Sequence, residues 1–272
     1  YRRLLVLAVA CWCIVMNNKQ FNRIKPIFAV TLTYFGLIAY PILGLAQPRN
    51  SSQSLPIRFQ QQEDDGSGRG RPGRRGGTGS RGDCPPVEVS LTALMPATNL
   101  GSSVEAHPTL WFYVPYKSGE VASGEFSLQD EQNNDIYRTN FTLPETPGIV
   151  GFSLASAAPL EINKKYQWYV KLYCSGQKSS TPVFIRGWVE RVTPKPELAR
   201  QLQTVTTPRE RIALYAQNGI WYSALSELAK LRRGEPQNAT VDSDWANLLR
   251  DVGLGNIAQQ PILGEVSVQQ KR

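Results

Sequence analysis

The residues best suited to chemistry in this chain are aromatic. Trp111 and Tyr113 fall on one face of an expected strand, and Tyr169 and Tyr173 fall on the polar face of another. Aromatic rings on an open sheet surface can stack on sugar rings, so these four side chains form a candidate carbohydrate-binding platform. The alternative is that the helical half of the chain covers this face and that the aromatic side chains belong to the core.

Catalytic groups are scarce by comparison. The chain has one histidine, His107, so a Ser-His-Asp or Cys-His centre would depend on that residue alone. No His/Cys cluster suggests a metal site, and no glycine-rich loop joins an expected strand to a helix as a nucleotide cradle. Two carboxylates suffice for a glycosidase, but nothing in the sequence singles out a pair. We therefore expect no enzyme activity, no metal and no cofactor.

The N-terminal part resembles an export signal. A basic run at 17–25 follows Met16, and an uncharged apolar run extends from Pro26 to Leu45. This order predicts a signal peptide over 16–46, with cleavage between Ala46 and Gln47.

Two further expectations concern this region. Residues 1–15 contain a second apolar run that is too short to span a bilayer, and we interpret them as a non-native upstream extension. The 20 apolar residues of the signal could instead stay as an uncleaved membrane anchor. In either case the folded part is expected in the periplasm, in the envelope or outside the cell.

Residues 47–83 are rich in Gly, Ser, Gln, Pro and Arg, and Gly66–Gly82 has no aliphatic or aromatic side chain. Such a segment buries too little apolar surface to offset the entropy of ordering, so we expect a disordered Gly/Arg-rich linker. Arg75-Gly76-Gly77 is similar to the tracts of RNA-binding proteins, but an exported protein meets no RNA. A spacer is the simpler role, and weak attraction to anionic lipid or acidic cell-wall polymer is the alternative.

The net charge of +8 is located outside the expected folded part. Residues 84–272 carry 18 basic and 18 acidic side chains, so the excess belongs to the leader and the linker. A neutral domain has no broad field to attract a phosphate backbone. We expect no nucleic-acid partner.

Two cysteines follow the expected cleavage site, Cys84 and Cys174. An even pair in an oxidising compartment predicts one disulfide. The bond would link the entry of the folded region to the end of a strand.

Residues 84–192 show the alternation of strands. In Lys165–Cys174 every second residue is apolar or aromatic, which is typical of a half-buried antiparallel strand. Further short strands and a hairpin with a polar turn at 130–135 predict an antiparallel β-sandwich. The approach from Leu160 to Tyr166 is similar to the tyrosine corner of immunoglobulin and fibronectin type III domains.

Residues 193–256 are expected to be helical, followed by a tail over 257–272. Thr207-Pro208-Arg209-Glu210 is a strong helix start, and Trp245, Leu248, Leu249 and Val252 have helical spacing. The stretch from Leu214 to Pro236 resembles a single tetratricopeptide repeat. The fold class is therefore α+β. The helical hairpin either packs on the sandwich or provides a peptide-binding groove.

Four short stretches of the sequence resemble the cyanobacterial family known as domain of unknown function 928. They are Pro108-Thr109-Leu110-Trp111-Phe112-Tyr113-Val114-Pro115-Tyr116, Gly187-Trp188-Val189-Glu190-Arg191, Tyr215-Ala216-Gln217-Asn218-Gly219-Ile220-Trp221-Tyr222 and Leu248-Leu249-Arg250-Asp251-Val252-Gly253-Leu254. The resemblance implies an exported protein and provides no catalytic residues. We expect non-enzymatic binding or scaffolding at the cell envelope, with an envelope polysaccharide or an envelope protein as partner. A carbohydrate-binding module is the alternative, and an envelope hydrolase is the third hypothesis.

Overall fold

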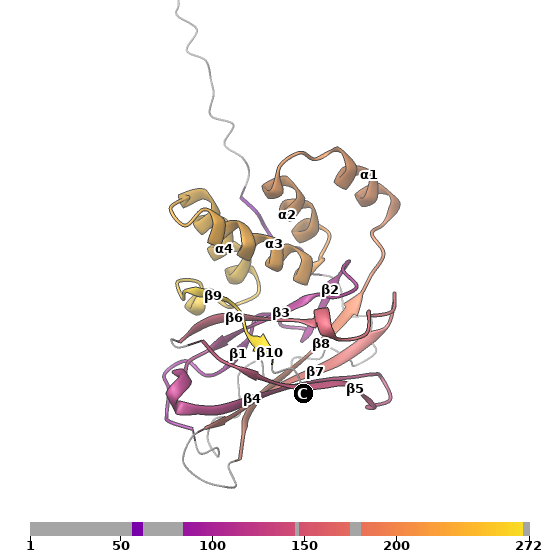
Figure 1. The fold of residues 1–272 in the computed structure, drawn as a ribbon. Helices are drawn as coiled ribbons and strands as arrows, with labels where there is room; N and C mark the ends of the chain where they lie inside the picture. The colour runs from indigo at the N-terminus through magenta and orange to yellow at the C-terminus, as the bar shows by residue number, and fades with distance from the viewer. Residues whose placement is uncertain (1–55, 62–83, 145–146, 175–180, 269–272) are drawn as a thin grey trace, which may run out of the picture. The chain divides into compact units, whose positions relative to one another are not determined.

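The computed structural model describes residues 56–61, 84–144, 147–174 and 181–268 (Figure 1). The predicted signal peptide over 16–46, its cleavage between Ala46 and Gln47, and the extension over 1–15 lie outside the described residues. Within the described residues, no helix is both long and apolar enough to cross a bilayer.

The strands form two sheets. The first sheet has four strands in the order β1 (Thr92–Ala93), β3 (Thr109–Val114), β6 (Gly148–Ser153), β9 (Ile262–Glu265). The second sheet has six strands in the order β10 (Ser267–Val268), β5 (Asp135–Thr142), β4 (Val121–Gln129), β7 (Lys165–Cys174), β8 (Val183–Arg191), β2 (Leu100–Ser103). The fold is therefore mixed α+β with a sandwich-like pair of sheets.

Aromatic side chains fill the space between the sheets. Phe126 of β4 stacks on Phe152 of β6 with ring centroids 3.9 Å apart, and Phe141 of β5 contacts Phe152 edge-on at 5.7 Å. The alternation predicted for β7 is confirmed over 168–174, where Trp168, Val170 and Leu172 are buried. The residues that alternate with them keep partial exposure: Tyr169, Lys171 and Tyr173. Side chains that alternate in this way place one face of each sheet in a shared core.

The prediction of a purely antiparallel sandwich is wrong in two places. β2 pairs with β8 in parallel, and β6 pairs with β9 in parallel. Parallel neighbours need a long connection between them. β9 and β10 lie in the segment that was expected to be a tail, and they return to the two sheets after the helices.

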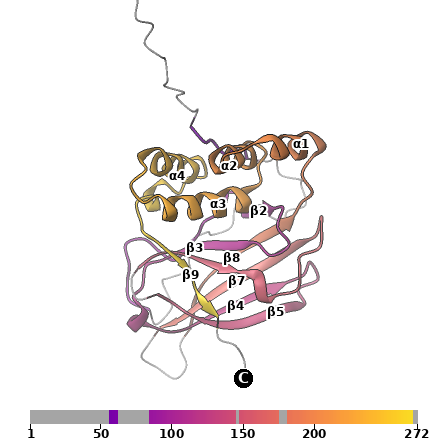
Figure 2. The ribbon, with the colours of Figure 1, turned by 45° about the horizontal axis from the view of Figure 1, so that its top comes forward.

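Four α-helices follow β8. They are α1 (Pro196–Thr204), α2 (Pro208–Gln217), α3 (Trp221–Gly234) and α4 (Ala239–Asp251), and three 3₁₀ turns lie at Ser118–Glu120, Leu154–Ser156 and Gly255–Ile257. The predicted start of α2 is confirmed, because the Thr207 side chain accepts from the Glu210 N–H and the Glu210 carboxylate accepts from the Thr207 N–H. The helices form a layer on the side of β3 that faces away from the six-stranded sheet (Figure 2).

Helix α3 joins this layer to both sheets. The Trp221 indole N–H donates to the Leu94 carbonyl at 2.8 Å. Tyr222 is fully buried, and its hydroxyl accepts from the Trp168 indole N–H of β7 at 3.1 Å. Burial raises the pKa of Tyr222, so it stays a neutral hydrogen-bonding group. The helices therefore share one core with the sheets.

The expectation of a disordered linker over 47–83 fails for residues 56–61. Ile57 is buried, and Phe59 packs against Trp221. The partners of this segment lie more than 150 residues away in sequence, so local composition could not reveal them.

Candidate functional site

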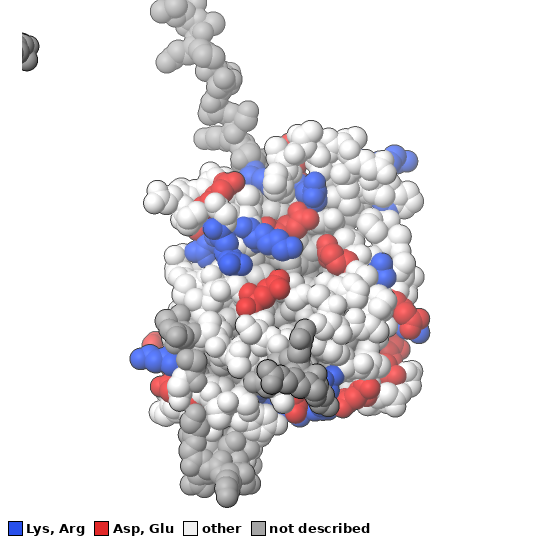
Figure 3. All heavy atoms as spheres, viewed as in Figure 1, with Lys and Arg blue, Asp and Glu red and all other residues white. Residues whose placement is uncertain are grey.

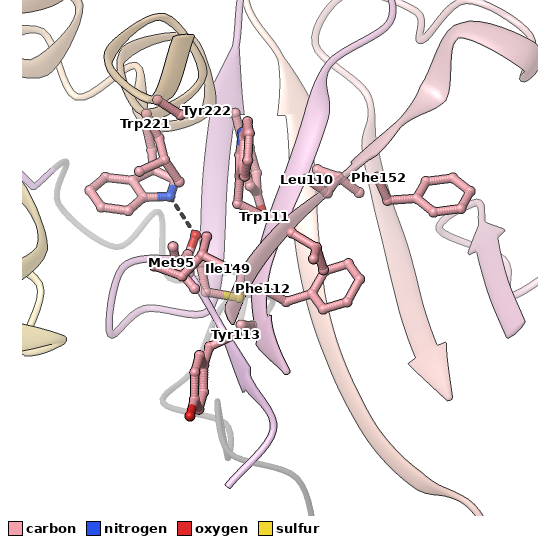
Figure 4. Packing of buried hydrophobic residues seen from close by; sticks show 14 of the residues in the cluster. Met95, Leu110, Trp111, Phe112, Tyr113, Ile149, Phe152, Trp221 and Tyr222 are labelled. Atoms are coloured by element: carbon pink, nitrogen blue, oxygen red, sulfur yellow. Dashed lines mark hydrogen bonds between the residues drawn. The ribbon is translucent and has the colours of Figure 1, made fainter. Parts of the chain in front are cut away.

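Trp111 and Tyr113 of the predicted platform are both buried residues of β3. Trp111 is 2% exposed, and its indole N–H donates to the Ser226 hydroxyl of α3 at 2.9 Å. Tyr113 is also buried, and this burial raises the pKa of its hydroxyl. Figure 4 shows Trp111 on the side of β3 that faces Trp221 and Tyr222. These two rings are core residues, as in the alternative that the sequence left open.

Tyr169 and Tyr173 lie in the other sheet. They alternate with the buried residues of β7, so they face away from the core, and both keep partial exposure. The structure therefore does not bring the four predicted aromatic residues onto one face. The helices described here lie against β2 and β3, and none of them covers the outer side of β4, β7 and β8 (Figures 1 and 2).

Two further aromatic side chains join the tyrosines on this outer face. In β8, Val183, Ile185 and Val189 are buried, so Phe184 and Trp188 point outward with partial exposure. Among the described residues, the aromatic side chains that are not buried are Phe59, Tyr137, Tyr169, Tyr173, Phe184 and Trp188. Four of these six therefore belong to one sheet surface, which we call the outer aromatic face: Tyr169, Tyr173, Phe184 and Trp188.

The strand register places polar partners beside each ring. Tyr169 is opposite Arg186, Phe184 is opposite Lys171, and Trp188 is opposite Gln167. The Tyr169 hydroxyl donates to the Gln167 side-chain oxygen at 2.8 Å. The sequence contained a signal for Phe184 and Trp188, because the period of two in Val183–Arg191 already assigns them to the polar side.

A series of ion pairs links β7 to β4 and β5 on the same side of the sheet. The Lys171 ammonium lies 3.0 Å from the Glu125 carboxylate, and the Arg138 guanidinium donates to Glu125 and to Asp135. Hydrogen bonds from Gln129 and Arg138 lower the pKa of Asp135, and the hydrogen bond to Asp135 together with the charge of Glu125 raises the pKa of Arg138. This surface therefore offers fixed donors and acceptors next to aromatic rings, which suits polar ligands with flat apolar faces.

The predicted disulfide is present in the structure. Cys84 and Cys174 are bonded, with their Cα atoms 5.1 Å apart. Cys174 is the last residue of β7, so the bond connects the start of the folded region to a central strand of the six-stranded sheet.

Acidic and basic groups elsewhere have structural partners. The Glu105 carboxylate accepts from the hydroxyls of Ser103 and Ser223, which joins β2 to α3. Burial raises the pKa of Glu227, and the nearby charge of Glu105 adds to this effect. His107 is exposed, and its Nδ1 lies 3.1 Å from the Leu154 carbonyl. The described part of the chain contains no group of three or more His, Cys, Asp or Glu side chains that could hold a metal ion.

Basic side chains gather over the ends of α3 and α4 (Figure 3). Here Arg232 and Arg233 line a hollow of about 360 Å³ together with Asp242. The Arg232 Nε donates to Asp242 at 2.7 Å, and its guanidinium lies 5.5 Å from the centre of the Trp245 ring. Arg232 thus has a packing role that links α3 to α4.

Comparison with known proteins assigns the chain to a family. No curated protein matches the chain in sequence. Residues 76–262, which make up more than half of the chain and include both sheets' main strands and all four α-helices, match the family described as Domain of Unknown Function (DUF928). The chain therefore belongs to the DUF928 family.

Proposed function

We propose that this protein is a non-enzymatic binding protein that is exported and acts at the cell envelope, and that its ligand-facing surface is the outer aromatic face. The observation that carries the proposal is the gathering of Tyr169, Tyr173, Phe184 and Trp188, all partly exposed, on the side of β7 and β8 that no described helix covers. Most other aromatic side chains of the described residues are buried. Partly exposed rings lose contact with water when a ligand stacks on them, which favours binding.

The ligand class that fits this face is a polysaccharide of the envelope. Sugar rings have flat apolar faces and hydroxyls at their edges. The hydroxyls could pair with Arg186, Lys171 and Gln167, which alternate with the aromatic rings. An envelope protein is the second candidate partner, because Tyr, Trp and Arg are also the residues that most often anchor protein interfaces.

One sequence feature and one structural feature support export. The predicted leader over 16–46 and the bonded Cys84–Cys174 pair both fit an oxidising compartment. We also propose kinship of the sheets with immunoglobulin and fibronectin type III domains. The Tyr166 hydroxyl supports it, because it accepts from the Glu161 N–H at 3.2 Å as in a tyrosine corner. We likewise propose that the α2–α3 helix pair is similar to a tetratricopeptide repeat.

A hydrolase is the weaker alternative. It would need a pair of carboxylates, and Glu105 with Glu227 is one pair that interacts electrostatically. The Ser103 and Ser223 hydroxyls both donate hydrogen bonds to the Glu105 carboxylate, which favours a structural role for Glu105.

The test is binding of the full chain to a panel of insoluble envelope polysaccharides. We expect saturable retention of the wild type, and a loss of at least about fivefold in affinity for Tyr169→Ala/Tyr173→Ala, which corresponds to about 1 kcal/mol. The control is Ile162→Ala, which removes an exposed apolar side chain that is not one of the four aromatic rings. Retention that is equal in the double variant and the control would refute the proposal, and release of reducing sugar would favour the hydrolase.

A further inference from the structure

Residues 56–61 lie in a groove of the helical layer, between α2 and α4 (Figure 1). The backbone N–H of Ile57 donates to the Asp244 carboxylate at 3.2 Å, and that of Phe59 donates to the Asp251 carboxylate at 2.8 Å. Both acids belong to α4 and are two helical turns apart. Two alternate N–H groups of the segment thus point to the same helix, as they do in an extended chain.

The remaining contacts involve α2, α3 and the side chains of the segment. The Gln60 N–H donates to the Ala216 carbonyl at 3.0 Å. The Phe59 ring meets the Trp221 ring edge-on with centroids 4.9 Å apart. The Arg58 guanidinium binds the Asp251 carboxylate at 2.7–3.0 Å. Each residue from 57 to 60 therefore has its own partner in the helical layer.

The groove is built around a buried carboxylate. Asp244 is 2% exposed, and besides Ile57 it binds the Arg209 guanidinium at 2.6 and 3.0 Å. Without the segment, Asp244 would lose a hydrogen-bond donor and the buried site of Ile57 would open to water. Gln60 and Gln61 line a hollow of about 490 Å³ together with residues that connect β8 to α1 and α2 to α3. Main-chain capture combined with side-chain sites is how proteins recognise extended peptides.

The stretch of chain between this segment and the first sheet has the composition of a linker that would tether a bound peptide. Residues 62–83 separate it from Cys84, and within them Gly66–Gly82 has no aliphatic or aromatic side chain. We propose that the groove between α2 and α4 is a binding site for extended peptides that carry an aliphatic residue, an arginine and an aromatic residue in succession. Ile57, Arg58 and Phe59 are its resident ligand, bound within the same chain.

The test uses the full chain and a fluorescein-labelled peptide with the sequence of residues 56–61. Ile57→Asp places a charge beside Asp244 and should release the tethered segment. Ile162→Asp, at a side chain that is 50% exposed, is the matched control. We expect the peptide to bind the Ile57→Asp chain saturably and at least about tenfold more tightly than the control. In the control the tethered segment competes at an effective concentration of about millimolar.

Two changes check that the recognition is specific. Adding Asp251→Asn to the Ile57→Asp chain, or Arg58→Glu to the peptide, should reduce binding at least about tenfold, or about 1.4 kcal/mol. An Ile57→Asp chain that keeps its circular dichroism spectrum but binds the peptide no better than the control would overturn the proposal. A wild-type dimer by light scattering that Ile57→Asp abolishes would overturn the assignment of the ligand to the same chain.

Hydrogen exchange on the unaltered chain provides an independent test, which holds even if Ile57→Asp fails to fold. We expect the amides of Ile57, Phe59 and Gln60 to exchange through a local opening that leaves α2 and α4 protected. Exchange of these three amides only together with the core amides of α3 would make the segment an integral part of the fold, and would overturn the proposal.

Discussion

Removal of the Cys84–Cys174 bond should cost this fold a large part of its stability. The two residues are 90 positions apart in sequence. In the chain-entropy model, the closure of a loop of this length restricts the unfolded chain by about 4–5 kcal/mol. We therefore expect Cys84→Ala/Cys174→Ala to lower the free energy of unfolding by about that amount. Alanine is the better replacement at Cys174, which is 3% exposed, because serine would bury a hydroxyl.

The assay is equilibrium unfolding in guanidinium chloride, followed by circular dichroism. For a folded part of this size the denaturant slope is roughly 4–5 kcal/mol per molar, so the midpoint should fall by about 1 M. The control is the same comparison under a thiol reductant, which removes the bond from the wild type and should bring the two midpoints together. Coincident midpoints for the Cys84/Cys174 variant and the wild type without reductant, or reactive thiols at Cys84 and Cys174 in the native chain, would refute the reasoning.

Three further predictions follow from buried contacts. Because the raised pKa of Glu227 means that the folded state binds its proton more tightly than the unfolded state, stability should fall as pH rises above about 4.3, the ordinary carboxyl value. Glu227→Gln should therefore match the wild type in melting temperature near pH 4 and exceed it at pH 7, and a constant difference would contradict this. Gly101→Ala would place a Cβ 2.5 Å from the Tyr222 ring, so we expect a loss of about 1–3 kcal/mol by thermal melting, whereas Gly119→Ala meets no atom within 4 Å and should be nearly neutral. Thr207→Ala removes the side-chain cap of α2 and should cost about 1 kcal/mol in urea unfolding, and an unchanged midpoint would argue against the capping box.

Local patterns in the sequence were sufficient to predict an element when its structure depends on residues close to one another in the chain. The alternation in Lys165–Cys174 identifies β7 and its buried face, because successive strand residues point to opposite sides. The Thr207–Glu210 box identifies the start of α2, because both of its hydrogen bonds are local. The same period of two in β8 would have added Trp188 to the candidate site.

Contacts between distant segments were beyond local reasoning. An aromatic residue such as Trp111 fits both a core position and a ligand-binding surface. Its contact with Ser226 of α3, 115 residues away in sequence, shows that it belongs to the core. Ile57-Arg58-Phe59 is too short to show a period, and its acidic partners are 187–193 residues away. β9 and β10 have four and two residues, so their strand character depends on the neighbours with which they pair.

The most direct test of the proposed ligand surface is the collisional quenching of tryptophan fluorescence by acrylamide, with and without an envelope polysaccharide that retains the protein. Trp188 is the tryptophan of the described residues that keeps solvent exposure, and the difference between the wild type and Trp188→Phe isolates its signal. If the ligand stacks on the outer aromatic face, the polysaccharide should shield Trp188 and reduce its quenching constant. Quenching of Trp188 that is unchanged at saturating polysaccharide would contradict the account.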